Sequence, residues 1–138
     1  MRQAGVMVIV KNGLILAVSR RNDPTRFGLP GGKVEPSETP EEAAIRETFE
    51  ETNVTVHSCR AIYKREEPAS RPGGEMFYAY AFYATSWEGE PRESEEGIVK
   101  WVLAEELTSR EHGAFPDYNW DTLNALKIIF PNVNILGD

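Results

Sequence analysis

Cysteine is nearly absent from this sequence, and long hydrophobic runs are lacking. The single cysteine, Cys59, excludes an internal disulfide and fits a reducing compartment. The apolar run 6–10 is too short for the core of a signal peptide, and no stretch approaches the roughly 20 residues that span a bilayer. We therefore expect a cytoplasmic protein without a membrane partner.

An excess of positive charge is also lacking. Lys and Arg number 15 against 22 Asp and Glu, which gives a net charge of −7. An acidic chain is poorly suited to nucleic acid as a partner, because such binding depends on cationic contacts to phosphates. A polyphosphate substrate would be repelled as well unless metal cations bridge it to the protein. The two histidines, His57 and His112, stand alone, and we assign them no role.

What the sequence does contain is typical of an ordinary globular protein. Its 138 residues, 41% hydrophobic and 27% charged, predict one domain over residues 1–138 with a substantial core. Asn12-Gly13 separates two β-type runs and is a strong hairpin signal. The pattern predicts an α/β fold in which helices cover a mixed β-sheet. We expect strands at 5–11, 14–19, 54–65, 76–87 and 98–103, helices at 39–52 and 119–130, a helical turn at 104–107, and loops at 20–29 and 67–75.

The helix at 39–52 has clear start signals. Thr39 is a good N-cap, Pro40 fits the first helical position, and Glu42 is placed to complete a capping box. On a period of 3.6 residues, one face of this helix is expected to pack against the core. That face consists of Ile45, Thr48, Phe49 and Thr52.

The nearly opposite face of this helix carries three glutamates, Glu47, Glu50 and Glu51. Like charges at this spacing repel one another and weaken an isolated helix. Carboxylate oxygens clustered on a rigid element suit Mg²⁺ or Mn²⁺, whose charge would relieve the repulsion. For a bare E-x-x-E-E pattern, an ordinary solvated acidic face is the commoner outcome. The residues that precede the helix favour the metal interpretation.

Taken together, residues 32–54 resemble the Nudix box, whose pattern is G-x5-E-x7-R-E-U-x-E-E-x-G-U with U an apolar residue. Two positions depart from it: Thr48 stands in place of an apolar residue and Asn53 in place of the last glycine. Thr48 can bury its methyl group, and Asn is the next-best residue for a left-handed helix cap. The pattern is matched by Gly32, Glu38, Arg46, Glu47, Glu50, Glu51 and Val54.

The resemblance implies the α/β/α Nudix fold over essentially the whole chain. It also implies cleavage of a nucleoside diphosphate linked to another group X, by attack of water on phosphorus. Glu47, Glu50 and Glu51 would then be metal ligands together with the carbonyl of Gly31, and Glu47 would be the candidate general base. Arg46 would hold the helix carboxylates in place.

A later acidic loop, at 93–96, is similar to a loop of MutT-type Nudix hydrolases in which a glutamate joins the metal site. The spacing to Trp101 selects Glu95 for this role, with Glu96 as the fallback. A solvated turn is the plain alternative.

Two further residues are candidates for substrate binding. Asn119 resembles the MutT-type asparagine that reads an oxidised guanine, since its amide can donate and accept hydrogen bonds; capping of the last helix by Asn119 or Asp117 is an equal alternative. Arg21 lies where a MutT-type arginine approaches a phosphate, and it could equally be a solvated loop charge. Four aromatic residues could stack a base, although strand aromatics are more often core. They are Phe27, Tyr78, Tyr80 and Trp120.

The resemblance thus predicts a Mg²⁺-dependent pyrophosphohydrolase, with Mn²⁺ as an alternative ion. The substrate expected first is an ordinary or oxidised purine (d)NTP, cleaved to the monophosphate and pyrophosphate. The alternatives are ADP-ribose, a dinucleoside polyphosphate, or a nucleotide-binding Nudix module without catalysis. A homodimer is left open.

Overall fold

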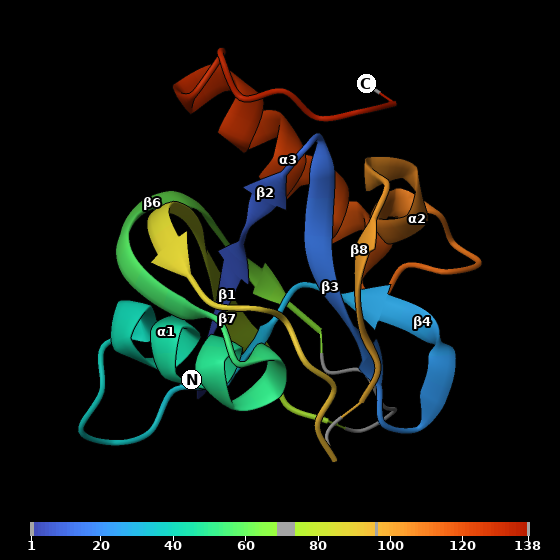
Figure 1. The fold of residues 1–138 in the computed structure, drawn as a ribbon. Helices are drawn as coiled ribbons and strands as arrows, with labels where there is room; N and C mark the ends of the chain where they lie inside the picture. The colour runs from blue at the N-terminus through green and yellow to red at the C-terminus, as the bar shows by residue number, and fades with distance from the viewer. Residues whose placement is uncertain (1, 69–73, 96, 138) are drawn as a thin grey trace.

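The computed structural model describes residues 2–68, 74–95 and 97–137. Two β-sheets and three helices make up these residues (Figure 1). In chain order the elements are β1 (Arg2–Val8), β2 (Val10–Lys11), β3 (Leu14–Arg20), β4 (Asp23–Gly28), β5 (Gly31–Lys33), α1 (Pro40–Thr52), β6 (Thr55–Glu67), β7 (Phe77–Glu88), β8 (Val99–Val102), α2 (Ala104–Thr108) and α3 (Pro116–Ile129).

The first sheet has the strand order β5-β1-β7-β6. β1 and β7 run parallel, whereas β5 pairs with β1 and β6 pairs with β7 in the antiparallel sense, so the sheet is mixed. The predicted α/β class with a mixed sheet is therefore confirmed. The parallel pairing brings the start of the chain beside residues 77–83, which are more than 70 positions away in sequence.

A second, antiparallel sheet was not expected from the sequence. It consists of β2, β3 and β4, with β8 paired to the other side of β3. β2 and β3 form the predicted hairpin, in which Asn12 and Gly13 both take positive φ (52° and 81°). β4 lies in the segment that we expected to be a loop. It is an edge strand of the described sheet, with β3 as its neighbour, and an edge strand tolerates a proline such as Pro24.

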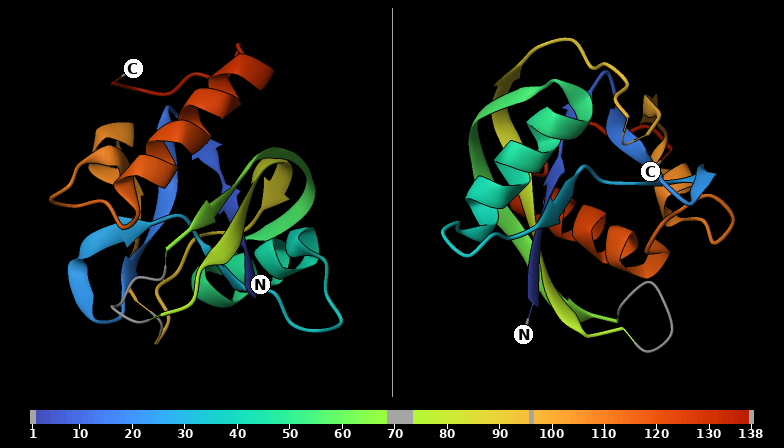
Figure 2. Two further views of the ribbon diagram at one scale, coloured as in Figure 1. Left: turned by 180° about the vertical axis from the view of Figure 1, so that it is seen from behind. Right: turned by 90° about the horizontal axis from the view of Figure 1, so that it is seen from below.

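Helices cover both faces of the first sheet, with α1 on one side and α3 on the other (Figure 2, right). Consecutive residues of β1 explain how one strand serves two layers. Met7 is fully buried in the cluster that includes Ala44 of α1, and Val8 is fully buried in the cluster that includes Leu126 of α3. The side chains of a strand alternate between faces, so both faces of β1 must be apolar.

The helix α1 begins and ends as predicted. Thr39 is the N-cap and forms both bonds of the capping box with Glu42. Asn53 takes the left-handed conformation (φ 69°), and its backbone N–H donates to the carbonyl of Phe49 at 2.9 Å. An asparagine thus ends the helix where the Nudix pattern has its last glycine.

The buried face of α1 differs from the prediction at Phe49. Its buried residues are Ala43, Ala44, Thr48 and Thr52, whereas Phe49 is 51% exposed. The sheet packs closely against the small residues Ala43 and Ala44. The face of α1 that contacts the sheet is therefore rotated away from the larger Phe49.

The helix α3 starts at Pro116, three residues before the predicted start. Its N-cap residue is Phe115 in the left-handed conformation, and no side chain caps this end, so the capping alternative for Asn119 and Asp117 is wrong.

The other predicted strands and the turn at 104–107 are confirmed as β6, β7, β8 and α2. The predicted loop at 67–75 falls partly outside the described residues, and Glu67 belongs to β6.

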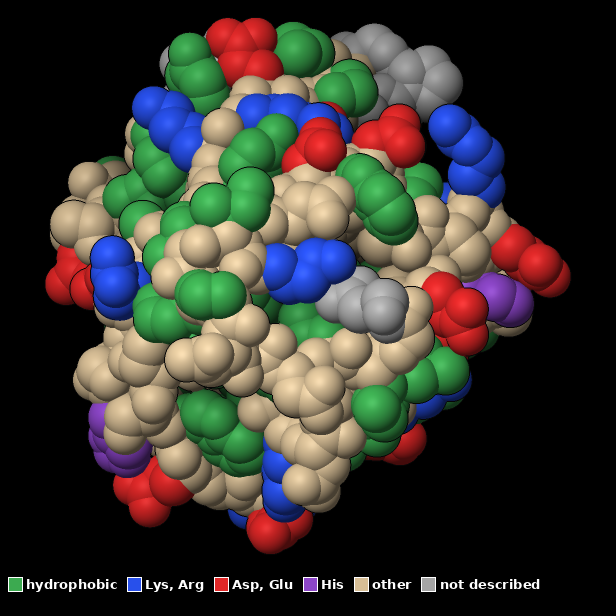
Figure 3. Space-filling model, turned by 90° about the horizontal axis from the view of Figure 1, so that it is seen from above, with side chains coloured by type: hydrophobic (Ala, Val, Ile, Leu, Met, Phe, Trp, Pro, Cys, Tyr) green, Lys and Arg blue, Asp and Glu red, His purple; other side chains and the backbone are tan. Residues whose placement is uncertain are grey.

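No helix in the described ranges is long and apolar enough to cross a membrane. The face seen in Figure 3 carries acidic and basic side chains scattered among apolar ones. Cys59 is partly buried on β6, and this desolvation raises the pKa of its thiol to about 12.

Candidate active site: a carboxylate-lined cleft beside an aromatic one

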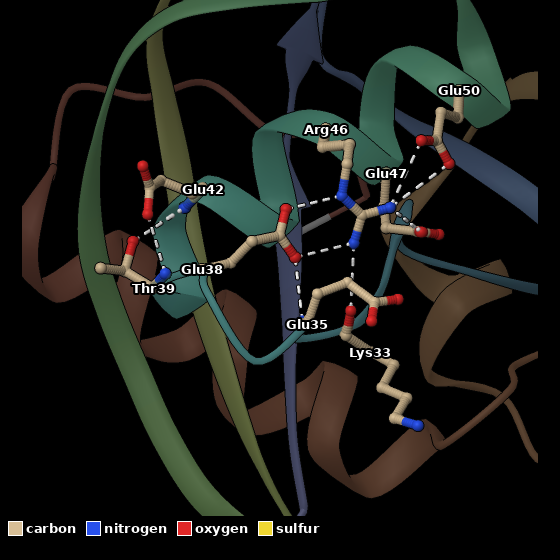
Figure 4. A network of polar contacts seen from close by, with 8 residues as sticks. All are labelled: Lys33, Glu35, Glu38, Thr39, Glu42, Arg46, Glu47 and Glu50. Atoms are coloured by element: carbon tan, nitrogen blue, oxygen red, sulfur yellow. Dashed lines mark hydrogen bonds and ion pairs between the residues drawn. The ribbon is translucent and has the colours of Figure 1, made fainter.

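One arginine organises the polar surface of α1 (Figure 4). Arg46 forms a two-point ion pair with Glu38, with Nε–Oε2 and Nη2–Oε1 distances of 2.6 and 2.9 Å. Its Nη1 donates to Glu47 Oε1 at 2.6 Å and more weakly to Glu50 Oε1 at 3.3 Å. Nη2 also donates to the Lys33 carbonyl at 3.2 Å. The planar guanidinium therefore ties β5, the loop before α1 and α1 itself into one unit.

Glu38 is the anchor of this network. Its Oε1 also accepts from the backbone N–H of Glu35 at 2.9 Å, which closes the loop that leads into α1. The hydrogen bonds from Arg46, and then that from Glu35, lower the pKa of Glu38 to about 2 from an ordinary value near 4.5. The carboxylate therefore stays charged throughout the ordinary pH range.

This pKa shift predicts a pH-dependent contribution to stability. Because the folded-state pKa is depressed, the contribution of Glu38 is present above about pH 4.5 and is lost as the pH falls towards about 2. Urea unfolding of the wild type and of Glu38→Gln should therefore differ at pH 7 and converge near pH 2. A difference in unfolding free energy that stays constant from pH 7 to pH 2 would contradict this assignment.

Two consecutive glycines of β5 let α1 carboxylates approach the backbone. A Cβ atom on Gly32 would lie 2.5 Å from Oε2 of Glu47, and a Cβ on Gly31 would lie 2.2 Å from the Gly5 carbonyl oxygen. The backbone N–H of Gly31 donates to Oε1 of Glu51 at 2.8 Å. Glycine is therefore required at position 31, where a Cβ would clash with backbone, whereas a Cβ at position 32 would displace the side chain of Glu47.

Glu47 and Glu51 line a cleft of about 400 Å³ between α1 and the second sheet. Arg20 and Arg21 line the same cleft, so its wall carries two cations as well as two carboxylates. This arrangement suits a ligand that carries both phosphate groups and cations. The remaining lining residues are Val18, Ser19, Asn22, Gly28, Leu29 and Gly31.

A larger cleft of about 560 Å³ adjoins the first and shares Arg20, Gly28, Leu29 and Gly31 with it. Phe77 and Phe115 line this larger cleft and pack edge to face, with ring centroids 6.3 Å apart. The guanidinium carbon of Arg20 lies 5.3 Å from the centroid of the Phe115 ring, which is a cation–π contact at the junction of the two clefts.

Asn119 lies in the first turns of α3, is 3% exposed and lines the larger cleft. Its Nδ2 donates to the carbonyls of Leu107 and Ala114, at 2.9 and 2.7 Å. Both amide hydrogens are therefore used by the backbone, and only Oδ1 remains for a ligand. The structure thus places Asn119 in the wall of the larger cleft, where its side chain can act towards a ligand only as an acceptor, not as a donor and acceptor together.

The other predicted residues lie in different settings. Glu50 points to the flank of α1, where its side chain is 47% exposed and contacts Arg46. Glu95 is exposed in the turn between Ser94 and Gly97 and is absent from the lining of both clefts. This loop is attached beside the smaller cleft, because Ser19 Oγ accepts from the backbone N–H of Ile98 at 2.9 Å. Glu96, the fallback, lies outside the described residues.

Sequence reasoning missed several lining residues. None of the four aromatics proposed for stacking lines either cleft, whereas Phe77 and Phe115 do. Phe115-Pro116 could have been found from its place just before the last helix. Arg20 was overlooked beside Arg21, and Glu67 was read as part of a loop; only the pairing of β7 with β1 on one side and with β6 on the other reveals where Glu67 lies.

The donor set of the smaller cleft fits a hard divalent cation. Mg²⁺ keeps several waters and is usually bound by one or two carboxylates together with substrate phosphates. Glu47 and Glu51 supply two carboxylates at one wall, and Gly31 brings backbone to the same wall. Within the ranges 2–68, 74–95 and 97–137, no group of three or more Asp, Glu, His or Cys side chains is assembled for a metal. The two carboxylates Glu47 and Glu51 suit an ion that shares its ligands with a substrate.

Comparison with known proteins places these features in a family. A family model described as the NUDIX domain matches residues 1–123. The 8-oxo-dGTP diphosphatase of Escherichia coli is 31% identical over 102 residues, which are 74% of each chain. The ADP-ribose pyrophosphatase of Methanocaldococcus jannaschii is 41% identical over 73 residues, 50% of this chain and 42% of that protein.

Solved structures agree with the fold. The crystal structure of a MutT NUDIX hydrolase from Burkholderia pseudomallei matches with a TM-score of 0.74 and 26% identity, over 88% of this chain and 97% of that one. Curated relatives from Bacillus subtilis and Roseobacter denitrificans are longer, and the match spans 64% of each. The chain thus spans less than two thirds of the length of several relatives it matches.

Proposed function

The chain belongs to the Nudix family, and on this basis we propose that it hydrolyses a phosphoric anhydride bond of a nucleotide. The proposed substrate is an ordinary or oxidised purine nucleoside triphosphate, which is cleaved to the monophosphate and pyrophosphate. Nudix hydrolases generally use divalent metal ions, and we propose Mg²⁺ for this chain.

The observation that supports this proposal is the contact between two clefts of different character. The larger cleft presents the rings of Phe77 and Phe115, which suit the flat faces of a base. The smaller cleft presents Glu47 and Glu51, which suit metal-bridged phosphates. Because the two clefts share lining residues, one nucleotide can occupy both.

In the proposed reaction, water attacks a phosphorus atom, and the bond to the bridging oxygen breaks as pyrophosphate leaves. When bound, the metal neutralises charge on the phosphate oxygens. Glu47 is our candidate for accepting the proton of the attacking water. Its Oε1 is held by Arg46, which fixes the direction of the carboxylate. Glu51 is fixed from the other side by the backbone N–H of Gly31.

Two arginines complete this assignment. We propose that Arg20, where the two clefts meet, and Arg21, in the smaller cleft, balance the charge of the phosphates. In an acidic chain with a net charge of −7, such local cations matter for attracting a polyanion. The relatives named for 8-oxo-dGTP and for ADP-ribose differ in substrate, so the choice between these classes rests on measurement.

The testing experiment is a hydrolysis screen with and without Mg²⁺ across dNTPs, 8-oxo-dGTP, ADP-ribose and diadenosine polyphosphates, with products identified. Pyrophosphate together with a purine monophosphate is the expected result. Cleavage only of ADP-ribose or of a dinucleotide would replace our substrate assignment. Nucleotide binding without any turnover would favour a binding module over an enzyme.

The close approach of Gly32 to Glu47 leads to a sharper prediction. In Gly32→Ala the new Cβ would meet the carboxylate of Glu47, which Arg46 holds from the other side. We expect Glu47 to be displaced and kcat to fall by roughly 10- to 100-fold. Steady-state kinetics test this, and thermal unfolding measured in parallel separates a displaced side chain from a lost fold. Wild-type kcat in a folded Gly32→Ala protein would contradict the proposed role of Glu47.

A further inference from the structure

Two buried polar side chains face the larger cleft from different elements. Glu67, the last residue of β6, is 7% exposed, and Asn119 of α3 is 3% exposed. Tyr118 also lines the cleft, but its hydroxyl donates to the carbonyl of Ala79 at 3.0 Å and is not available. A buried carboxylate is costly unless it has partners, so the partners of Glu67 need to be accounted for.

Glu67 is held by Arg65 through one oxygen. Arg65 Nη2 donates to Glu67 Oε1 at 2.9 Å, while its Nη1 pairs with Asp121 of α3. The guanidinium carbon of Arg65 lies 5.6 Å from the centroid of the Tyr118 ring. The arginine is thus fixed by two carboxylates and a ring, and it fixes the orientation of Glu67 in turn.

The second oxygen of Glu67, Oε2, accepts no hydrogen bond from any residue in the described part of the chain. Oδ1 of Asn119 likewise accepts no hydrogen bond from the described residues. The amide nitrogen of Asn119 donates to the carbonyls of Leu107 and Ala114. Two backbone carbonyls can bond only to the NH₂ group, so this arrangement also settles which way the amide points. The buried polar groups of the cleft therefore present acceptors and no donors.

We infer that Glu67 is a specificity-determining residue of the base site, where it accepts a hydrogen bond from the exocyclic amine of a purine. The inference rests on the proposed function in taking the larger cleft as the site of a nucleobase. Two acceptors on two side chains match an edge with two adjacent N–H donors. Guanine has such an edge, with its N1–H and 2-amino groups, and hypoxanthine lacks the amine.

This assignment also separates two features of the substrate. An oxygen added at C8 of guanine lies on the opposite side of the ring system from the N1–H and 2-amino edge. The contact to Glu67 therefore serves ordinary and oxidised guanine alike.

The test is equilibrium binding of dGMP and dIMP, measured by calorimetry in the absence of a divalent metal. These ligands differ only in the 2-amino group. The wild type should bind dGMP about 10-fold or more tightly than dIMP, because a hydrogen bond to a charged group is lost with the amine. Glu67→Gln keeps the size of the side chain and can still accept from Arg65, but it turns a donor towards the amine. This variant should lose or reverse the preference.

Asp121→Asn is the matched control, because it changes the other ion pair of Arg65 and does not line the cleft. It should keep the dGMP preference of the wild type. If Glu67→Gln fails to fold, Glu67→Asp keeps the charge but shortens the reach, and the preference should fall in that variant.

Three results would overturn the inference: equal binding of dGMP and dIMP by the wild type, no binding of either, or a preference that survives in Glu67→Gln. Because no hydrolysis is involved, the binding ratio is independent of whether the protein turns over any substrate. Turnover of a purine triphosphate with no role for Glu67 would keep the proposed function and remove only this inference.

Discussion

Replacing Glu51 with glutamine should lower kcat by roughly 100- to 1000-fold while the protein stays folded. Glu51 lines the smaller cleft, and the amide of glutamine supplies neither the charge nor the second anionic oxygen that a divalent cation needs. Metal stabilisation of transition-state charge is worth several kcal/mol, and each 1.36 kcal/mol corresponds to about a factor of ten in rate. Steady-state kinetics over a range of Mg²⁺ concentrations measure the loss.

Glu50→Gln is the matched control on the same helix. Glu50 is absent from the lining of the smaller cleft and contacts Arg46 on the flank, so its replacement should cost less than that of Glu51. The pattern E-x-x-E-E alone gives no reason to rank the loss of activity in Glu51→Gln above that in Glu50→Gln. Equal losses in the two variants, or a larger loss in Glu50→Gln, would show that the carboxylates rearrange when substrate and metal bind.

Leu126→Ala should destabilise the protein by about 2–5 kcal/mol. Leu126 of α3 is completely buried in the cluster between α3 and the two sheets, so truncation removes apolar contacts and leaves a cavity. Urea denaturation monitored by circular dichroism would give the change in unfolding free energy. A change below about 1 kcal/mol would mean that α3 does not depend on this contact.

Phe49→Ala provides the contrast. Phe49 is 51% exposed, so its truncation should cost about 1 kcal/mol or less, although phenylalanine is the larger side chain. A sequence-based argument would have ranked the two substitutions in the opposite order. A loss of several kcal/mol in Phe49→Ala would indicate that a partner or a second copy covers this face in solution.

The local features of α1 could be predicted because they depend on neighbours in sequence. Thr39, Pro40 and Glu42 start the helix through bonds that span three residues, and Asn53 ends it with one left-handed residue. The hairpin at Asn12-Gly13 is local in the same sense. The ion pair of Arg46 with Glu38 spans only eight positions, and the spacing of the family pattern preserves it.

The error at Phe49 arose from a helical period applied without knowledge of the partner surface. Periodicity shows which residues share a face, but it does not show where the sheet meets that face. Ala43 and Ala44 allow close approach, so the contact stripe follows the small residues. In the same way, β4 was missed because its strand character comes from pairing with β3 rather than from its own composition.

The sequence by itself determined the family pattern, the ends of α1 and the carboxylate-rich face, because each depends on residues close together in the chain. Only the tertiary structure decided which carboxylates face a cleft, and it separated Glu47 and Glu51 from Glu50. It also decided the walls of the larger cleft, since Phe77, Phe115 and Glu67 come from three separate segments. Glu67 and Phe77 meet as cross-strand partners of β6 and β7, and Phe115 packs on Phe77 from the start of α3; side-chain periodicity carries no information about such contacts.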